Sequence, residues 1–226
     1  MDRDFGRGKR TVQLDIHSSD DKARLMELVK TCDVFIQGFR PGSLAAYGLS
    51  VDKMVKLNPS IIVANMSAFG SRGPWSGRRG FDSLVQTCSG MNVSEAEHAG
   101  KGEVARPTPC QALDHASGYL LASGVMMAVY KRAMQKEAGP WRVDVSLAGV
   151  MKYLRSLGQY PGATGFVVAD YTTPGDVPAD YMETRDTGFG VMTAVKHSAS
   201  LDDGKMQVGW VVMPKPLGLD DPTWLE

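Results

Sequence analysis

Hydrophobic and small residues run almost unbroken through the middle of the chain, from Leu113 to Tyr130. Two prolines come shortly before this run, and the basic pair Lys131 and Arg132 closes it, as is typical of the two ends of a helix. Apolar and small residues occur on all sides of this helix. The pattern therefore predicts a buried helix with neighbouring elements packed closely all around it.

Shorter apolar stretches on both sides of this helix predict strands alternating with further helices. The expected strands cover residues 11–16, 33–37, 61–66 and 141–146. One expected helix begins near Ser18, and a separate small helix ends at Gly48. Three more cover residues 51–57, 82–90 and 147–157. Ser50 is placed to cap the helix at 51–57, and Asn58 with Pro59 to stop it. Strand, helix, strand, helix, strand with crossovers of this length predicts an α/β protein with a parallel sheet and flanking helices.

Two polar stretches are expected to be long loops, at residues 70–80 with three arginines and at residues 92–108. From Tyr160 onward the chain is rich in Gly, Pro, Asp and Thr, with strand-like patterns only at residues 192–196 and 207–212. We therefore expect an α/β core over residues 1–160 and an irregular C-terminal segment of loops and short strands over residues 161–226.

Composition narrows the class of protein. The 226 residues are 43% hydrophobic, and Lys plus Arg equals Asp plus Glu at 25 each, so no overall charge indicates a nucleic-acid partner. Three scattered cysteines, Cys32, Cys88 and Cys110, form no Cys-x-x-Cys pair. This spacing argues against a disulfide framework and against a zinc site, and we expect no bound metal.

The sequence shows no targeting signal or membrane-spanning segment. The longest apolar run is shorter than the roughly 20 residues that span a membrane. Residues 1–10 lack the apolar stretch of a signal peptide, and the C-terminal Trp-Leu-Glu is no peroxisomal signal. We therefore expect a cytoplasmic protein without a membrane partner, although a mitochondrial or peroxisomal location stays open.

Asp114 is the acidic residue at the start of the central helix. One interpretation is that it is simply an N-cap, since Asp is a favoured capping residue. The other is that the helix start holds it charged for chemistry, through free backbone N–H groups and the positive end of the helix dipole. Local sequence alone leaves both interpretations open.

Seven stretches, in order, resemble the class III coenzyme A transferases of the CaiB/BaiF type. They are Arg7-Gly-Lys-Arg-Thr-Val-Gln-Leu-Asp-Ile, Phe39-Arg-Pro-Gly with Tyr47-Gly-Leu, Leu57-Asn-Pro-Ser-Ile-Ile, Ser67-Ala-Phe-Gly with Gly73-Pro, Gly80-Phe-Asp, Asp114-His-Ala-Ser-Gly and Val143-Asp-Val-Ser-Leu. The resemblance covers residues 7 to about 150. It implies a Rossmann-like sheet and an interlocked homodimer.

The resemblance also implies a function. In the family, an aspartate at the position of Asp114 attacks an acyl-CoA thioester, and an aspartyl-CoA thioester later passes CoA to an acceptor acid. Nearby backbone N–H groups could stabilise the oxyanion. CoA is then a substrate, with no permanently bound cofactor. The family pattern places CoA contacts at Leu14, His17, Phe39, Arg40, Ser67 and Phe69. On residues alone, Arg40 could equally belong to a plain turn, and Arg7, Lys9 and Arg10 to a solvated basic patch.

The sequence departs from the family pattern at several points. Gly38 stands where the family turn usually begins with Asn, and Ala46 stands where an Arg is common. The family's N-terminal strand and loop, and its glycine-rich loop over the catalytic aspartate, have no clear counterpart. We therefore expect an N-terminally truncated member with a partial Rossmann-like sheet.

Two alternative functions remain open at this point. A truncated relative without a complete CoA site could be non-catalytic and act as a dimerising or binding fragment. The same fold also serves alpha-methylacyl-CoA racemase, which needs two bases. Phe81 stands where racemase relatives carry a His, which favours the transferase, although His115 and His197 are conceivable bases. The acyl donor and the acceptor acid cannot be identified from the sequence.

Overall fold

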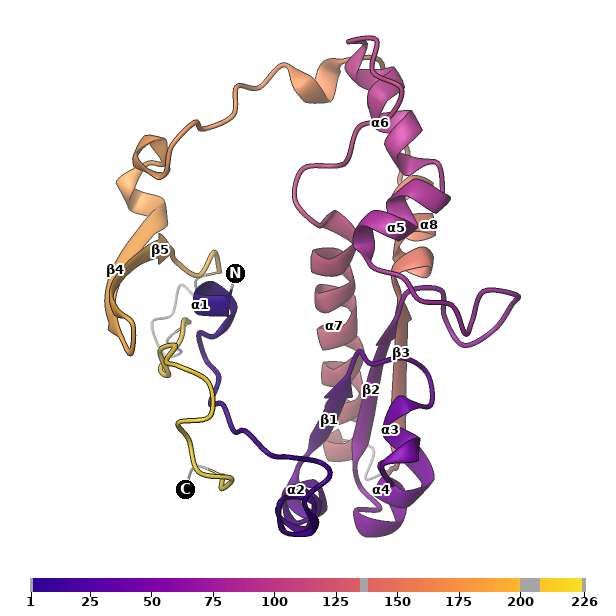
Figure 1. Cartoon of the computed structure of the whole chain (residues 1–226). Coiled ribbons are helices and arrows are strands. Elements are labelled where there is room, and N and C mark those ends of the chain that lie inside the picture. The colour runs from indigo at the N-terminus through magenta and orange to yellow at the C-terminus, as the bar shows by residue number, and fades with distance from the viewer. Residues whose placement is uncertain (1, 135–137, 200–207, 225–226) are drawn as a thin grey trace. The chain divides into compact units, whose positions relative to one another are not determined.

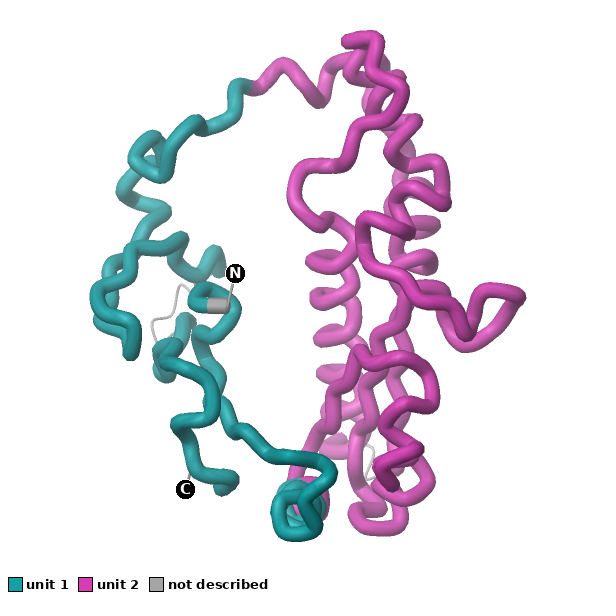
Figure 2. Tube along the Cα trace, viewed as in Figure 1, with its two compact units in different colours: residues 1–28, 169–226 teal, residues 29–168 magenta. Residues whose placement is uncertain are grey.

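The computed structural model of the protein describes residues 2–134, 138–199 and 208–224. The chain divides into two compact units, one of residues 29–168 and one that joins residues 1–28 to residues 169–226 (Figure 2). Each unit is described by itself below. The predicted boundary near residue 160 between a core and a C-terminal segment stays a prediction.

A three-stranded parallel sheet is the centre of the unit of residues 29–168 (Figure 1). Its strands are β1 (Val34–Gln37), β2 (Ile62–Ser67) and β3 (Trp141–Ser146), in the order β1-β2-β3. The register places Gln37 of β1 opposite Asn65 of β2, and Asn65 opposite Asp144 of β3. Because the strands are parallel, their carboxyl ends lie at one edge of the sheet, the edge at which such folds bind ligands. The predicted α/β class and these three strands are confirmed.

Helices cover both faces of this sheet. They are α3 (Ser43–Ala46), α4 (Val51–Leu57), α5 (Asp82–Cys88), α6 (Met91–Ala99), α7 (Ala112–Met134) and α8 (Leu147–Ser156), and α2 (Ser19–Thr31) ends in this unit. Gly124 of α7 lies directly against Val143 of β3. Met54 of α4 packs with Val63 of β2, whose side chain points to the face opposite to that of Val143.

The core of this unit has two clusters of buried side chains. The first joins the end of α2 to α4 and β2 through Val29, Met54, Ile61 and Val63. The second lies near the carboxyl edge of the sheet and consists of Ala68, Val85, Leu113 and Leu147. Since Leu113 is completely buried there, the start of α7 is fixed by packing as well as by hydrogen bonds.

Apart from most of α2 and a hairpin, the other unit has little regular structure in its described residues. It contains α1 (Asp2–Phe5), 3-10 turns at Pro174–Asp176 and Ala179–Tyr181, and the antiparallel strands β4 (Met182–Thr187) and β5 (Gly190–Val195). A further 3-10 turn, Thr164–Phe166, belongs to the unit of residues 29–168. Arg7 is 6% exposed and donates to Glu183 Oε1 at 3.1 Å and to the Val195 carbonyl at 2.7 Å. Its guanidinium also lies 3.9 Å from the ring centroid of Trp210. Arg7 therefore ties the N-terminal residues to the hairpin.

Three predictions about secondary structure are wrong. Residues 11–16 form no strand. Thr11 donates to the Asp220 side chain and accepts from the Asp220 N–H, but among the described residues no second strand lies alongside to extend a ladder. The expected loop at 92–108 begins with α6, and the hairpin strand β4 was not predicted. In the segment 207–212, Gln207 lies outside the described residues, and residues 208–212 form no strand.

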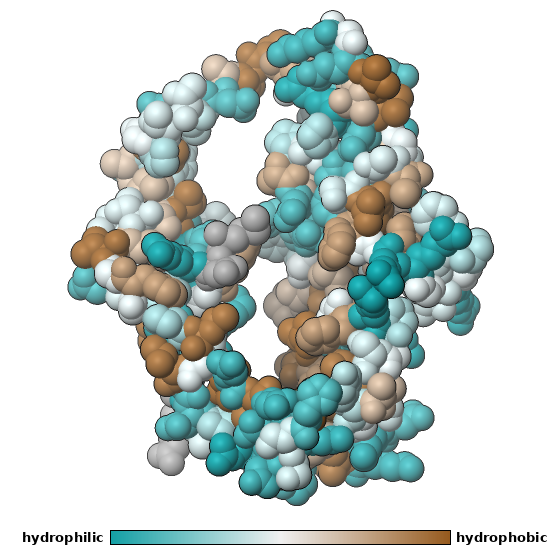
Figure 3. All heavy atoms as spheres, in the orientation of Figure 1, coloured by the Kyte–Doolittle hydropathy of each residue, from teal (hydrophilic) through white to brown (hydrophobic). Residues whose placement is uncertain are grey.

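The prediction that α7 is buried on all sides is also wrong. Only one side of α7 packs on β2 and β3, so Tyr119, Met126 and Tyr130 remain 75%, 64% and 57% exposed. Apolar atoms are visible in the region of α7 in the space-filling view (Figure 3). An all-apolar helix pattern therefore did not distinguish a core helix from one with an unoccupied apolar face.

Candidate functional site

Asp114 lies in the first turn of α7 and is half-buried. The helix begins two residues earlier, at Ala112, so Asp114 is not its N-cap. The carboxylate of Asp82, the first residue of α5, takes that role from another element. Its Oδ2 accepts hydrogen bonds from the backbone N–H of Leu113 at 2.7 Å and from that of Asp114 at 3.0 Å.

This arrangement corrects the expectation that the N–H groups at the helix start are free. Two of them, those of Leu113 and Asp114, are occupied by Asp82, which is only 1% exposed. Partial burial raises the pKa of Asp114, the negative charge of Asp82 raises it further, and His115 partly opposes the change. Asp114 is thus more basic than an ordinary aspartate, whereas a helix end alone would lower its pKa.

A cavity of about 250 Å³ lies at the carboxyl edge of the sheet and brings together three of the residues expected to bind CoA, Phe39, Arg40 and Ser67. Three arginines line it, because Arg78 and Arg79 of the 70–80 loop join Arg40. Cationic side chains next to an exposed aromatic ring suit a ligand that carries both phosphate and a flat ring.

Gly80 allows the arginine-bearing loop to lie close to the sheet edge. A Cβ at this position would come within 2.5 Å of the Ala68 Cβ and 2.9 Å of the Phe69 ring. Phe81 follows in the cavity wall, 72% exposed, and is followed directly by Asp82. One short segment therefore connects the wall of the cavity to the residue that holds the start of α7.

The remaining residues expected to bind CoA are not in this cavity wall. Phe69 packs in the core cluster at the start of α7, and its ring centroid lies 5.0 Å from that of Trp75. Leu14 and His17 belong to the other compact unit, in a segment without a strand, and their role stays a prediction. The basic residues near the N-terminus are not a simple solvated patch, because Arg7 is buried and Arg10 pairs with Asp220 at 3.2 Å. Hydrogen bonds from Lys215, from the Thr11 backbone N–H and from Arg10 lower the pKa of Asp220 to about 2.

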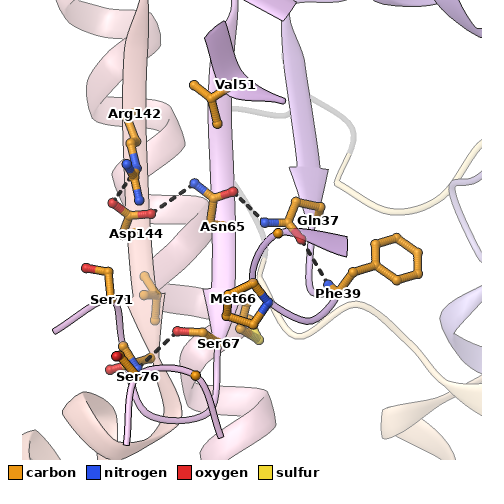
Figure 4. A pocket seen from close by; sticks show the side chains of 16 residues that line it. Gln37, Phe39, Val51, Asn65, Met66, Ser67, Ser71, Ser76, Arg142 and Asp144 are labelled. Atoms are coloured by element: carbon orange, nitrogen blue, oxygen red, sulfur yellow. Dashed lines mark hydrogen bonds and ion pairs between the residues drawn. The ribbon is translucent and has the colours of Figure 1, made fainter. Parts of the chain in front are cut away.

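A second and larger cavity, of about 520 Å³, has a row of polar side chains along its wall (Figure 4). Gln37 donates to Asn65 Oδ1 at 2.6 Å, and Asn65 donates to Asp144 Oδ1 at 2.9 Å, so the row crosses all three strands. Arg142 pairs with Asp144 at 2.7 Å, and Gln37 accepts from the N–H of Phe39 at 2.9 Å. The row therefore fixes the start of the turn that carries Phe39 and Arg40.

Sequence reasoning missed both Asp82 and this row. Asp82 was read only as part of the Gly-Phe-Asp stretch and as the start of the helix at 82–90, and its partners lie on another helix, 31 residues away in the chain. The polar row could have been found from the in-register positions of Gln37, Asn65 and Asp144, one on each predicted strand.

No helix in residues 2–134, 138–199 and 208–224 is long and apolar enough to cross a bilayer. In the same ranges, no three His, Cys, Asp or Glu side chains come together as a metal site would require.

Comparison with known proteins gives the chain a family context. The model of the family described as CoA-transferase family III matches residues 3–201. The probable fatty acyl-CoA transferase Rv3272 of Mycobacterium tuberculosis is 35% identical over 126 residues, which are 56% of this chain and 31% of that protein. The acetyl-CoA:oxalate CoA-transferase of Acetobacter aceti is 28% identical over 194 residues, 84% of this chain and 49% of that protein.

A solved structure extends the likeness of the fold over nearly the whole chain. A crystal structure of a mutant of Rv3272 superposes with a TM-score of 0.71, at 21% identity, and covers 94% of this chain and 81% of that one. The chain spans about a third to half the length of the two curated relatives named above.

Proposed function

The chain belongs to CoA-transferase family III, and we propose that it moves coenzyme A between an acyl-CoA thioester and a carboxylic acid through a covalent intermediate on Asp114. The observation that carries this proposal is the state of Asp114. It is a half-buried carboxylate in the first turn of α7, made more basic by its surroundings. Within the described part of the chain, its carboxylate accepts no hydrogen bond, so its lone pairs remain available for attack.

In the proposed reaction, the Asp114 carboxylate attacks the thioester carbonyl and expels CoA as a thiolate, leaving an aspartyl–acyl anhydride. The thiolate then attacks the aspartyl carbonyl, which releases the first carboxylate and forms an aspartyl-CoA thioester. The acceptor carboxylate attacks that thioester, expels the CoA thiolate and forms a second anhydride with Asp114. The returning CoA thiolate cleaves it at the acceptor carbonyl, which yields the new acyl-CoA and restores Asp114.

The cavity lined by Phe39, Arg40 and Ser67 supports a CoA site at the carboxyl edge of the sheet. We assign the phosphate groups of CoA to Arg40 and its neighbours Arg78 and Arg79, and the adenine ring to Phe39. Phe69, in the same unit, is a further proposed CoA contact, and the role of Leu14 and His17 in CoA binding stays a prediction. CoA is a substrate here and leaves with the product.

Mass spectrometry after incubation with a panel of acyl-CoA thioesters tests the proposal. We expect hydroxylamine to trap the intermediate as a hydroxamate on the peptide that contains Asp114. Asp114→Ala should lose the adduct and reduce transfer by roughly a thousandfold or more. Asp52→Ala is the matched control, because Asp52 is an exposed aspartate in the first turn of another helix.

Two results would count against the proposal. Turnover retained by Asp114→Ala would exclude Asp114 as the nucleophile. An unmodified Asp114 together with no heat of CoA binding in calorimetry would instead indicate a non-catalytic relative.

We further propose that the protein is a homodimer in which the exposed apolar face of α7 contacts the partner. Tyr119, Met126 and Tyr130 form part of that face and are all more than half exposed. Analytical ultracentrifugation should show a dimer, and Met126→Glu should shift it toward monomer. A monomeric wild-type protein at micromolar concentration would exclude this assembly.

A cytoplasmic location is the last element of the proposal. Cys32, Cys88 and Cys110 are all free thiols, as is usual in a reducing compartment. Fractionation of cells that express the full-length protein should recover it with cytoplasmic markers, and recovery with a membrane or an organelle would contradict this location.

A further inference from the structure

Asp82 is the most deeply buried ionisable side chain near Asp114, at 1% exposure. One of its oxygens accepts from the N–H groups of Leu113 and Asp114, and the other accepts from the Gln86 amide. The amide oxygen of Gln86 in turn accepts from the backbone N–H of Thr108 at 3.1 Å. Asp82 and Gln86, both on α5, thus connect the loop before α7 with the first turn of α7.

The direction of every hydrogen bond in this network is determined. Backbone N–H groups can only donate, so the Gln86 oxygen must face Thr108, and the Gln86 amide nitrogen must therefore face Asp82. Asp82 receives donors at both of its oxygens, the pattern for which a carboxylate provides acceptors on both sides. An amide at this position would place an N–H group against the N–H group of Gln86, and buried groups with such a mismatch are costly.

The same network determines what the Asp114 carboxylate can do. The N–H groups in the first turn of a helix attract the nearest carboxylate, which on α7 is that of Asp114 itself. Because Asp82 already occupies the N–H groups of Leu113 and Asp114, the Asp114 side chain is not drawn back onto its own backbone. Asp82 points at the backbone of α7, so it does not form an acid–base pair with Asp114.

We propose that Asp82 is a positioning residue for the transfer reaction: it anchors the first turn of α7 and leaves the Asp114 carboxylate free to face the thioester. This inference rests on the proposed role of Asp114 as the nucleophile. Two neighbouring groups act on the pKa of Asp114 through their charge, Asp82 on α5 and His115 on α7 itself. Of these two, Asp82 makes Asp114 more basic.

Exchanging charge and amide within the network tests the proposal. Asp82→Asn creates the mismatch with Gln86, and we expect kcat to fall by about 10- to 100-fold, with KM for acyl-CoA changed less than about threefold. Adding Gln86→Glu supplies acceptors for both the new amide and Thr108, so the double variant should recover most of kcat and thermal stability. Asp52→Asn, in the first turn of α4, is the control and should leave both parameters unchanged.

The pH profile separates positioning from a merely structural role. Asp82→Asn removes the negative charge of Asp82, and the double variant with Gln86→Glu moves it farther from Asp114. The pKa of Asp114 should fall in both, so the acidic limb of the kcat/KM profile should shift to lower pH. A folded Asp82→Asn variant with kcat within about twofold of wild type would overturn the proposal. So would a stable double variant that shows neither recovery of kcat nor a shift of the acidic limb.

Hydrogen exchange on the unaltered chain guards against variants that do not fold. Amide hydrogen exchange should be slower at Leu113 and Asp114 than at Ala112 in the same turn, and equal rates at all three would overturn the proposal. If the wild type forms no adduct, the proposed function fails by itself. NMR titration of the Asp114 carboxyl, with and without the Asp82 and Gln86 exchange, still shows whether Asp82 controls it.

Discussion

Replacing Gly124 by alanine tests how closely α7 lies on the sheet, and hence what fixes the position of Asp114. A Cβ at Gly124 would lie 2.6 Å from Val143 Cγ1. Carbon atoms in contact prefer about 3.5–4.0 Å, so the new methyl group lacks roughly 1 Å of space. Overpacking of this kind costs about 1–3 kcal/mol, because α7 or the Val143 side chain must move.

Gly118 on the same helix provides the matched control, since no atom lies within 4 Å of the position that its Cβ would take. Both substitutions gain about 1 kcal/mol of helix propensity. We therefore expect Gly118→Ala to stabilise the protein by about 1 kcal/mol. Gly124→Ala should be less stable than Gly118→Ala by the overpacking cost alone, about 1–3 kcal/mol.

Urea denaturation followed by circular dichroism measures the difference between the two variants. The double variant Gly124→Ala with Val143→Ala should be more stable than the sum of the two single effects, because the smaller side chain at 143 removes the clash. Equal stabilisation by Gly124→Ala and Gly118→Ala would refute the reasoning, since it would mean that α7 does not rest on β3 at this point.

Three further predictions concern buried polar groups, and urea denaturation measures each of them. Ser117→Ala should stabilise the protein by about 1 kcal/mol, because this fully buried hydroxyl has no hydrogen-bond partner within the described residues, and a loss of stability would contradict that. Asn58→Ala should cost about 2–3 kcal/mol, since it removes donors to the carbonyls of Val29 and Cys32, and a change below 0.5 kcal/mol, roughly the net worth of one bond, would contradict it. The pKa of Asp114 is raised on folding, so its protonated form stabilises the folded state below the ordinary pKa of about 3.9, and this contribution is lost as pH rises through the folded pKa. Asp114→Asn should therefore be more stable relative to wild type at pH 7 than at pH 3, and an equal difference at both pH values would contradict the raised pKa.

Sequence predicted those elements that depend on local signals. Ser50 caps α4 as expected, with its hydroxyl accepting from the Lys53 N–H at 3.3 Å, because an N-cap needs only residues three positions apart. The strand β2 was found because a buried parallel strand is a nearly continuous apolar run, whereas β3 was found from its alternation of apolar and polar residues. Helix α6 was missed although glycines with positive φ angles, Gly90 at 75° and Gly100 at 64°, flank it.

Elements that depend on distant partners were not predictable in this way. Alternation at residues 11–16 indicated a strand, but a strand also needs a neighbour, and nothing in those six residues specifies one. The exposure of Tyr119 and Met126 likewise depends on what lies beside α7, which the helix sequence does not encode. Asp114 was identified as a candidate from its motif, whereas Asp82 acts across 31 residues of chain, beyond the reach of any periodicity argument.

The arrangement at the start of α7 changes how the proposed nucleophile is activated. Sequence reasoning assigned the same backbone N–H groups to two tasks, holding Asp114 ionised and stabilising the oxyanion. Asp82 occupies the N–H groups of Leu113 and Asp114, so any oxyanion donor in the proposed reaction must come from other groups. Asp114 therefore lacks the stabilisation of its negative charge that these N–H groups would give. Its basicity is higher instead, because partial burial and the charge of Asp82 both raise its pKa. A more basic carboxylate is a better nucleophile toward a thioester as long as it remains ionised at the working pH. In our proposal, Asp82 therefore affects both the basicity and the position of Asp114. Exchanging the Asp82 charge with the Gln86 amide moves the charge but keeps the hydrogen bonds, so it separates the two effects.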